Sequence, residues 1–123
     1  MERKTVIAGL RAYRGIENAI SQKMIFAEEA EEKGKYEREA SELRRVKSGI
    51  LQCLNELPQM ERDCLWRHYI KGEVWVRICQ KHAYSERQIR NISNRGLKRL
   101  GDIFSGNPEV ARFCEQSEGR DTY

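Results

Sequence analysis

The first half of the chain carries two series of apolar positions, spaced alternately four and three residues apart. The first series has Glu17 as its polar member and otherwise consists of Val6, Leu10, Tyr13, Ile20, Met24 and Ala27. The second has Lys47 as its polar member and otherwise consists of Tyr36, Ala40, Leu43, Ile50, Leu54 and Leu57. Such an alternation is typical of the apolar seam of a helix that pairs with another helix. The pattern predicts helices near residues 4–31 and 36–57.

Folding the chain back near residue 32 brings the two series into register as an antiparallel helical hairpin of the coiled-coil type. Leu10 then faces Leu54, and the two polar members, Glu17 and Lys47, fall opposite each other. A buried layer of opposite charges specifies register more than it adds stability. The matched layers therefore predict a hairpin over residues 4–57.

Gly34 lies in the phase break between the two series and is expected to close the first helix in the left-handed conformation. Two alternatives remain open: one continuous helix with a stutter, or two helices that pair with a second subunit. A two-helix hairpin buries little apolar surface alone, so residues 4–57 are also expected to support a homodimer.

The second half of the chain predicts three further helices. Pro58 ends the preceding helix and can open the next one, which runs to about residue 70 before Lys71 and Gly72 stop it. Its apolar face consists of Met60, Cys64, Leu65, Trp66 and Tyr69. A short helix over about 74–82 follows, with a face made of Trp75, Ile78, Cys79 and His82. This order predicts a helix, a turn at residues 83–84 and a longer helix, which is the layout of a helix-turn-helix.

The longer helix has a clear start. Ser85 is a good N-cap, and Gln88 three residues later completes a capping box. One face of the helix is apolar or small and consists of Ile89, Ile92, Gly96, Leu100 and Ile103. The second helix of a helix-turn-helix lies in the DNA major groove, so the opposite face is the candidate reading surface.

That opposite face carries a stripe of Arg87, Asn91, Asn94 and Lys98, flanked by Arg90 and Arg95. Arginine suits bidentate contacts with guanine and asparagine with adenine, whereas Lys and Arg at the flanks suit phosphates. The alternative is a solvated helix face that happens to be basic. Because the stripe follows directly on a turn and a cap, we favour DNA contact through Ser85, Arg87, Gln88, Arg90, Asn91, Asn94, Arg95 and Lys98.

Composition and charge agree with this interpretation. Of 123 residues, 34% are charged and only two are proline, which favours an all-α fold with a modest core. The net charge is +4, and residues 58–105 alone contribute 10 basic against 5 acidic side chains. A basic block confined to the helix-turn-helix is expected of a nucleic-acid-binding protein.

Candidate chemistry outside DNA binding is sparse. No Gly-rich phosphate loop or nucleophile–base pair stands out, so we expect neither an enzyme nor a cofactor. Cys64, His68, Cys79 and His82 could be imagined around zinc, but their spacing matches no zinc pattern, so no metal is expected. Without a membrane span or signal peptide, the cysteines are expected as free thiols in the cytoplasm of a bacterial host cell.

The motifs of residues 57–104 can also be compared with a known family. They are Leu57-Pro58-Gln59-Met60-Glu61-Arg62-Asp63-Cys64-Leu65, Arg67-His68-Tyr69-Ile70, Trp75-Val76-Arg77-Ile78, Tyr84-Ser85-Glu86-Arg87 and Gly96-Leu97-Lys98-Arg99-Leu100. These motifs resemble the fourth conserved region of bacterial sigma factors. The whole chain resembles, in layout, the small sigma-region-four-like proteins of phages and prophages of Gram-positive bacteria. The resemblance implies a helix-turn-helix at 74–100 and a role in phage transcription, with RNA polymerase as a second partner.

The sequence departs from that family at several positions. Glu73 stands where a capping Ser or Thr is usual, and His82 replaces a core leucine. Ala83 replaces the turn glycine, and an alanine forced to positive φ costs about 1 kcal/mol. Gly96 replaces an alanine on the core face and is expected to allow close helix packing.

Together these observations divide the chain into a supporting or oligomerising hairpin (1–57), a DNA-binding module (58–105) and a tail (106–123). The tail is expected to hold a short helix from Pro108 to Gln116 and a frayed end from Ser117. The leading hypothesis is a sequence-specific double-stranded DNA-binding transcriptional regulator. The alternatives are a DNA-packaging protein like a small terminase subunit, and an RNA polymerase-interacting module that does not read DNA.

Overall fold

A computed structural model describes residues 1–29 and 33–121 of the chain. Helices make up nearly all of these residues, which contain no strand, so the prediction of an all-α fold is confirmed. The elements are α1 (Arg3–Tyr13), α2 (Ile16–Glu29), α3 (Lys33–Asn55), α4 (Gln59–Leu65), the π-helical turn η1 (Trp66–Ile70), α5 (Trp75–His82), α6 (Glu86–Ser105) and α7 (Pro108–Asp121).

The first predicted helix, over residues 4–31, is divided into α1 and α2. At the break, the amides of Arg14 and Gly15 donate to carbonyls three residues back, at 3.3 and 3.0 Å. The Arg14 guanidinium donates two hydrogen bonds to the carbonyl of Tyr69, at 3.0 and 2.8 Å. Hydrogen bonds from a charged donor contribute about 1.5–3 kcal/mol. The prediction of one continuous helix is wrong because the chain is redirected here; residues 30–31 lie outside the described residues.

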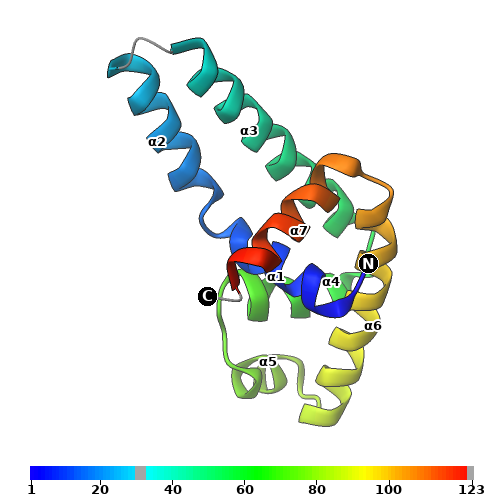
Figure 1. Ribbon diagram of the computed structural model, residues 1–123. Helices are drawn as coiled ribbons and strands as arrows, with labels where there is room; N and C mark the ends of the chain where they lie inside the picture. Colours follow the sequence, from blue (N-terminus) through cyan, green and yellow to red (C-terminus); the bar gives the residue numbers. More distant parts are fainter. Residues whose placement is uncertain (30–32, 122–123) are drawn as a thin grey trace.

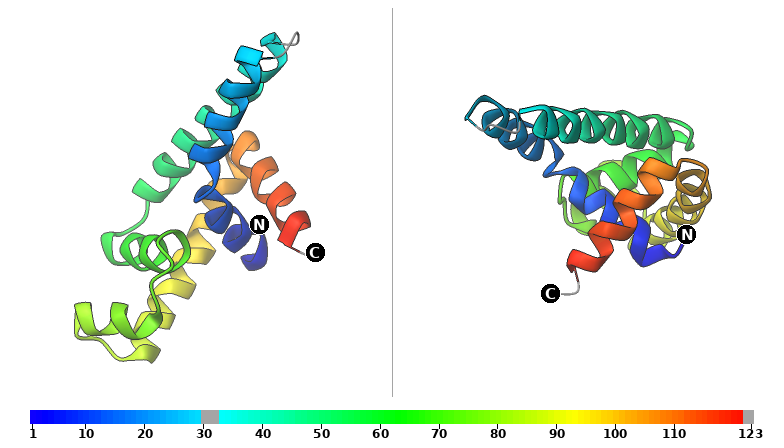
Figure 2. Two further views of the ribbon diagram at one scale, coloured as in Figure 1. Left: turned by 90° about the vertical axis from the view of Figure 1, so that its left-hand side faces the viewer. Right: turned by 45° about the horizontal axis from the view of Figure 1, so that its top comes forward.

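Helices α2 and α3 lie side by side and run in opposite directions (Figure 1). Residues 16–29 and 33–47, here called the arm, extend away from the other helices (Figure 2). Lys47 forms an ion pair with Glu17, which confirms the predicted pairing, but the Glu17 side chain is 65% exposed, so the predicted buried charged layer is wrong. Nearer the tip, the rings of Phe26 and Tyr36 lie 5.6 Å apart. The alternating pattern therefore applies to α2 and α3 as expected.

Gly34 does not close the first helix. It lies within the first turn of α3, and Gly72 is the described glycine that has a positive φ, at 76°. A Cβ at Gly34 would meet only the Nη1 of Arg38, at 3.7 Å. The prediction of a left-handed cap at this position is wrong, because the residue already belongs to the following helix.

Helix α1 packs mainly against α7, with further contacts to α6 and η1. Figure 2 shows α7 crossing α1. A Cβ on Gly9 would overlap the Sγ of Cys114, so glycine is what permits this close approach. Val6 and Leu10 are fully buried here instead of extending the seam along α3. The single main core therefore draws on all three of the ranges into which the sequence pattern divides the chain.

The tail is more ordered than predicted. Helix α7 continues five residues past the expected end, from Gln116 to Asp121, and Ser117 is buried with its hydroxyl donating to the carbonyl of Phe113 at 2.8 Å. The expectation of a frayed end from Ser117 is wrong for residues 117–121, because packing on α1 stabilises a helix whose sequence is mostly polar. Residues 122–123 lie outside the described residues.

Candidate nucleic-acid interface

The start of α6 is built as the sequence predicts. The Ser85 hydroxyl accepts from the amide of Gln88 at 3.2 Å, and the Gln88 side chain accepts from the amide of Ser85 at 2.8 Å. This is a complete capping box, and the prediction is confirmed. The reciprocal bonds satisfy two backbone donors and give α6 a defined first turn.

The turn before the cap contains Ala83, the one non-glycine residue in the described part of the chain that has a positive φ. Ala83 has φ 56° and ψ 37°, so it adopts the left-handed conformation although alanine stands where glycine is usual. Its amide and that of Tyr84 both donate to the carbonyl of Cys79, which closes α5. The left-handed conformation costs an alanine about 1–2 kcal/mol. Packing of α5 on α6 has to offset this cost.

That packing comes from a small second core. Cys64, Ile78 and Ile89 are fully buried and join α4, α5 and α6. Further along α6, a Cβ on Gly96 would lie 3.1 Å from the Cβ of Glu61 and 3.2 Å from Leu65. Gly96 thus allows α4 to approach closely, as predicted. Contacts at Ile89 and at Gly96 together fix which face of α6 is buried. The opposite face therefore remains exposed.

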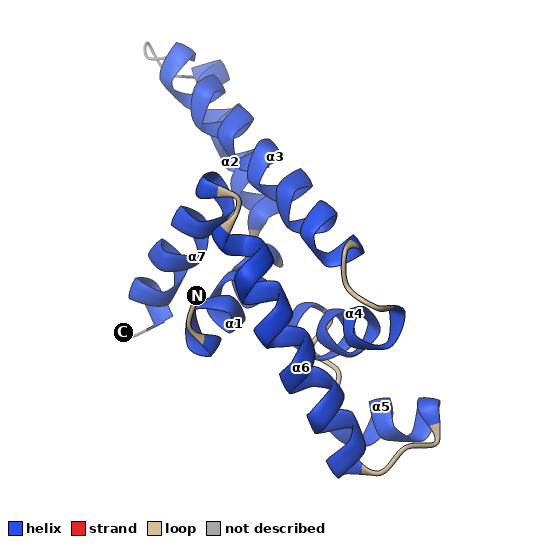
Figure 3. Cartoon of the chain, turned by 90° about the vertical axis from the view of Figure 1, so that its right-hand side faces the viewer, coloured by secondary structure: helices blue, strands red, loops and turns tan. Residues whose placement is uncertain are grey.

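The exposed face of α6 carries the predicted site residues. Figure 3 shows α6 running in front of α4, with α5 beside its first turns. All eight predicted residues are exposed: Ser85, Arg87, Gln88, Arg90, Asn91, Asn94, Arg95 and Lys98. Among the described residues, Arg87 and Lys98 have no hydrogen-bond or ion-pair partner within the chain. Their charged groups are therefore available to a ligand.

The eight residues are not equivalent. Gln88, Asn91 and Arg95 line a shallow groove of about 280 Å³ together with Tyr84 and Ile92. On the opposite edge, Arg90 pairs with Glu86 at 3.0 Å and lies 5.4 Å over the Trp75 ring, while Asn94 accepts from Arg3 of α1 at 3.4 Å. The structure thus divides the set into a groove edge and an edge next to α1.

Sequence reasoning missed the contribution of α1. Arg3, Lys4 and Arg11 line a second groove, of about 420 Å³, together with Arg90 of α6, and all four are exposed. The spacing of four between Arg3, Ile7 and Arg11 places these residues on one helical face, which is a usable signal. The hairpin prediction obscured this signal, because it placed residues 4–31 along the second helix of the hairpin.

The two histidines are engaged in local packing. His68 stacks on Trp75 with the ring centroids 3.7 Å apart, and its Nδ1 is 2.8 Å from the carbonyl oxygen of Glu73. Burial lowers the pKa of His68 below its ordinary value, and nearby arginines act in the same direction while the Glu73 hydrogen bond opposes them. His82 Nε2 lies 2.6 Å from Asp63.

The cysteines pack as small apolar groups. Burial raises the pKa of the Cys64 thiol to about 11 and that of Cys114 to about 12, so neither is an activated thiolate. Cys53 is also buried, Cys79 is half-buried, and all four thiols are free, as predicted. Among the described residues, no group of His, Cys, Asp or Glu is placed to hold a metal ion.

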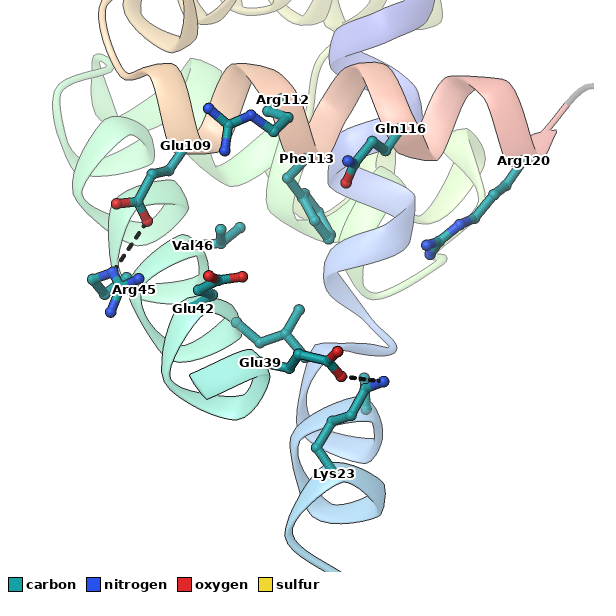
Figure 4. Close-up of a pocket in the computed structure, with 12 residues that line it drawn as sticks. Lys23, Glu39, Glu42, Arg45, Val46, Glu109, Arg112, Phe113, Gln116 and Arg120 are labelled. Atoms are coloured by element: carbon teal, nitrogen blue, oxygen red, sulfur yellow. Dashed lines mark hydrogen bonds and ion pairs between the residues drawn. The ribbon is translucent and has the colours of Figure 1, made fainter. Parts of the chain in front are cut away.

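A cavity of about 700 Å³ lies away from α6, between the arm and α7 (Figure 4). Its charges are mixed: Lys23 pairs with Glu39 at 2.7 Å, and Arg45 pairs with Glu109 at 3.3 Å. Phe113 and Gln116 also line it. A cavity whose charges largely neutralise each other is a weaker candidate for a polyanion than the basic surfaces of α6 and α1.

Comparison with family models, with curated proteins and with solved structures finds no match to this chain. Within the described ranges, no helix combines the length and the apolar character that a membrane span requires. Any functional assignment therefore depends on the residues and geometry given above.

Proposed function

We propose that this protein binds double-stranded DNA sequence-specifically as a phage-type transcriptional regulator, with α5 and α6 as a helix-turn-helix. The observation that carries the proposal is the exposed Arg and Asn face on a capped helix that directly follows a tight turn. Resemblance of the residue 57–104 motifs to sigma region four supports the same assignment.

The dimensions of α6 support insertion into a major groove. The helix has 20 residues, which corresponds to a length of about 30 Å. Arg87, Asn91, Asn94 and Lys98 lie at steps of four, three and four along it, so they share one face over about 16 Å. A major groove about 12 Å wide admits an α-helix, and Arg and Asn can each make bidentate contacts there.

The three parts of the face have different expected roles. Arg87 and Asn91, near the capped end, are the base-reading residues, because the N-terminal part of such a helix contacts base edges. Lys98 lies about two turns beyond Asn91 and suits a phosphate. Arg90 is held over Trp75 and contributes charge next to α1.

Selection from a random pool of duplex DNA tests the proposal first, because an enriched sequence would establish readout. An Arg87→Ala/Asn91→Ala variant should then lose the preference, with a cost of about 1–3 kcal/mol for each bidentate contact. The matched control is Arg44→Ala/Asn55→Ala, which changes an exposed Arg and an exposed Asn on α3.

The possible outcomes test the reading residues and DNA binding separately. If the α6 variant retains the wild-type preference, the assignment of the reading residues is wrong. If the wild-type protein binds no duplex even at low salt, the DNA-binding proposal itself is wrong. In that case a polymerase pull-down tests the module as a protein-interaction surface.

We also propose that self-association, if the regulator is dimeric, uses the arm. Val6, Ala8 and Leu10 of α1 are buried inside the chain, whereas Ile25 and Phe26 near the arm tip are 52% and 48% exposed. The arm tip and the α5–α6 turn lie at opposite ends of the molecule (Figures 1 and 2). Mass measurement in solution distinguishes a dimer from the large ring of a packaging protein.

A further inference from the structure

The groove between α1 and α6 is strongly cationic. It is lined by Arg3, Lys4 and Arg11 from α1 and by Arg90 from α6, with Glu118 of α7 as its one carboxylate. Lys4 lies 3.5 Å from Glu118 and 3.6 Å from Glu2, so its charge is largely matched within the chain. Arg90 pairs with Glu86 at 3.0 Å, so the unmatched positive charge of the groove comes chiefly from Arg3 and Arg11.

Arg3 and Arg11 have no carboxylate partner among the described residues. Arg3 instead donates a 3.4 Å hydrogen bond to Asn94, and the Arg11 guanidinium lies 5.9 Å from the centre of the Tyr69 ring. Both side chains are exposed. They are thus oriented by neutral groups, and their charge is left for an anion from outside the chain.

Three aromatic rings that pack on one another also line the groove. His68 stacks on Trp75, and Tyr69 meets both rings edge-on, with centroids 4.7 and 6.2 Å away. Arg90 lies over the Trp75 ring, which limits the positions its guanidinium can take. Preorganised guanidinium groups lose less side-chain entropy when they bind an oxyanion.

We infer that α1 is a second DNA-contacting element, in which Arg3 and Arg11, together with Arg90, bind the phosphodiester backbone beside the groove that α6 enters. The inference rests on the proposed function of α6. The hydrogen bond from Arg3 to Asn94 brings α1 up to the edge of the reading face. An α-helix occupies nearly the full width of the major groove. Cationic side chains at the edge of the groove therefore contact phosphates and not bases.

The contact should be electrostatic and independent of sequence. Each phosphate neutralised contributes about 0.9 to the slope of log affinity against log salt concentration. In an Arg3→Gln/Arg11→Gln variant the slope should become shallower by about 1.8, equally on a selected site and on random duplex. The ratio of wild-type to variant DNA affinity should fall about 12-fold between about 50 and 200 mM salt.

The matched control is Arg38→Gln/Arg44→Gln, which removes the same charge from exposed positions of α3. Its slope should equal that of the wild type. Arg3→Lys/Arg11→Lys should restore most of the slope, because it restores the charge. Arg3→Gln alone, which removes only the exposed contact to Asn94, should lower the slope by about 0.9 and covers the case in which the double variant does not fold.

Fluorescence anisotropy titrations at several salt concentrations measure these slopes, and thermal unfolding verifies that each variant is folded. An unchanged slope in the Arg3 and Arg11 variants, with intact DNA binding, would overturn the inference and leave the role of α6 standing. A loss of sequence preference without a change in slope would also contradict it. If the wild-type protein binds no DNA, the proposed function and this inference both fail.

Discussion

Replacing Gly9 with alanine tests the packing of α1 on α7. The added methyl group would overlap the Sγ of Cys114 and lie 3.1 Å from its Cβ and 3.4 Å from its Cα. Cys114 is fully buried, so its side chain has no free space to move into. Overpacking of this kind typically costs about 1–3 kcal/mol of unfolding free energy.

Whether Gly9→Ala lowers or raises the unfolding free energy distinguishes two placements of α1. If α1 instead continued along α3 in one long hairpin, Gly9 would flank the seam, and alanine would stabilise the helix by about 0.5–1 kcal/mol. Gly34→Ala provides the control for that outcome, because a Cβ there meets only the end of a flexible arginine, at 3.7 Å. We expect Gly34→Ala to stabilise and Gly9→Ala to destabilise.

Urea unfolding of a double-mutant cycle isolates the contact. Cys114→Ala removes the overlapping sulfur, so the cost of Gly9→Ala in that background should fall by about 1–2 kcal/mol. For a chain of this size, each kcal/mol corresponds to a shift in Tm of about 3–5 °C. A stabilising Gly9→Ala, or two substitutions that add without coupling, would refute the crossing of α1 and α7.

Two further predictions concern Ser93, which is buried on α6, and His68, which is half-buried in η1. Ser93 is 1% exposed and its hydroxyl has no hydrogen-bond partner among the described residues, so Ser93→Ala should raise the unfolding free energy by about 1 kcal/mol in urea titrations. The control Ser105→Ala, which removes a hydroxyl bonded to Gly101 at 2.9 Å, should not stabilise. The pKa of His68 is lower in the folded protein than in the unfolded chain. As the pH falls below about 6.5, the imidazole is therefore protonated more readily in the unfolded chain, and the free energy of unfolding should decrease. His68→Phe, which keeps a ring against Trp75, should weaken that pH dependence; equal slopes in both proteins between pH 7 and 5 would contradict the prediction.

The features that were predictable from sequence depend on residues close together in the chain. The capping box involves Ser85 and Gln88, three residues apart, and the position of the turn at residues 83–84 follows from the two helical patterns on either side of it. The exposed face of α6 follows from helical periodicity once its apolar face is known. The ion pair of Glu17 with Lys47 was also predictable, because the antiparallel register of α2 and α3 leaves only one position for a charged layer.

The position of α1 was not predictable in the same way. Its apolar residues, Val6 and Leu10, continue the spacing of α2, and such a pattern specifies that a face is buried but not which element covers it. The choice depends on contacts between residues far apart in sequence: Arg14 with the Tyr69 carbonyl, and Gly9 with Cys114. These contacts turn α1 away from the arm, extend α7 through residues 117–121 and place Arg3 beside Asn94. Local patterns along the chain thus specified most of the helices and the exposed face of α6. Only long-range packing, which periodicity does not encode, decided that α1 lies next to that face.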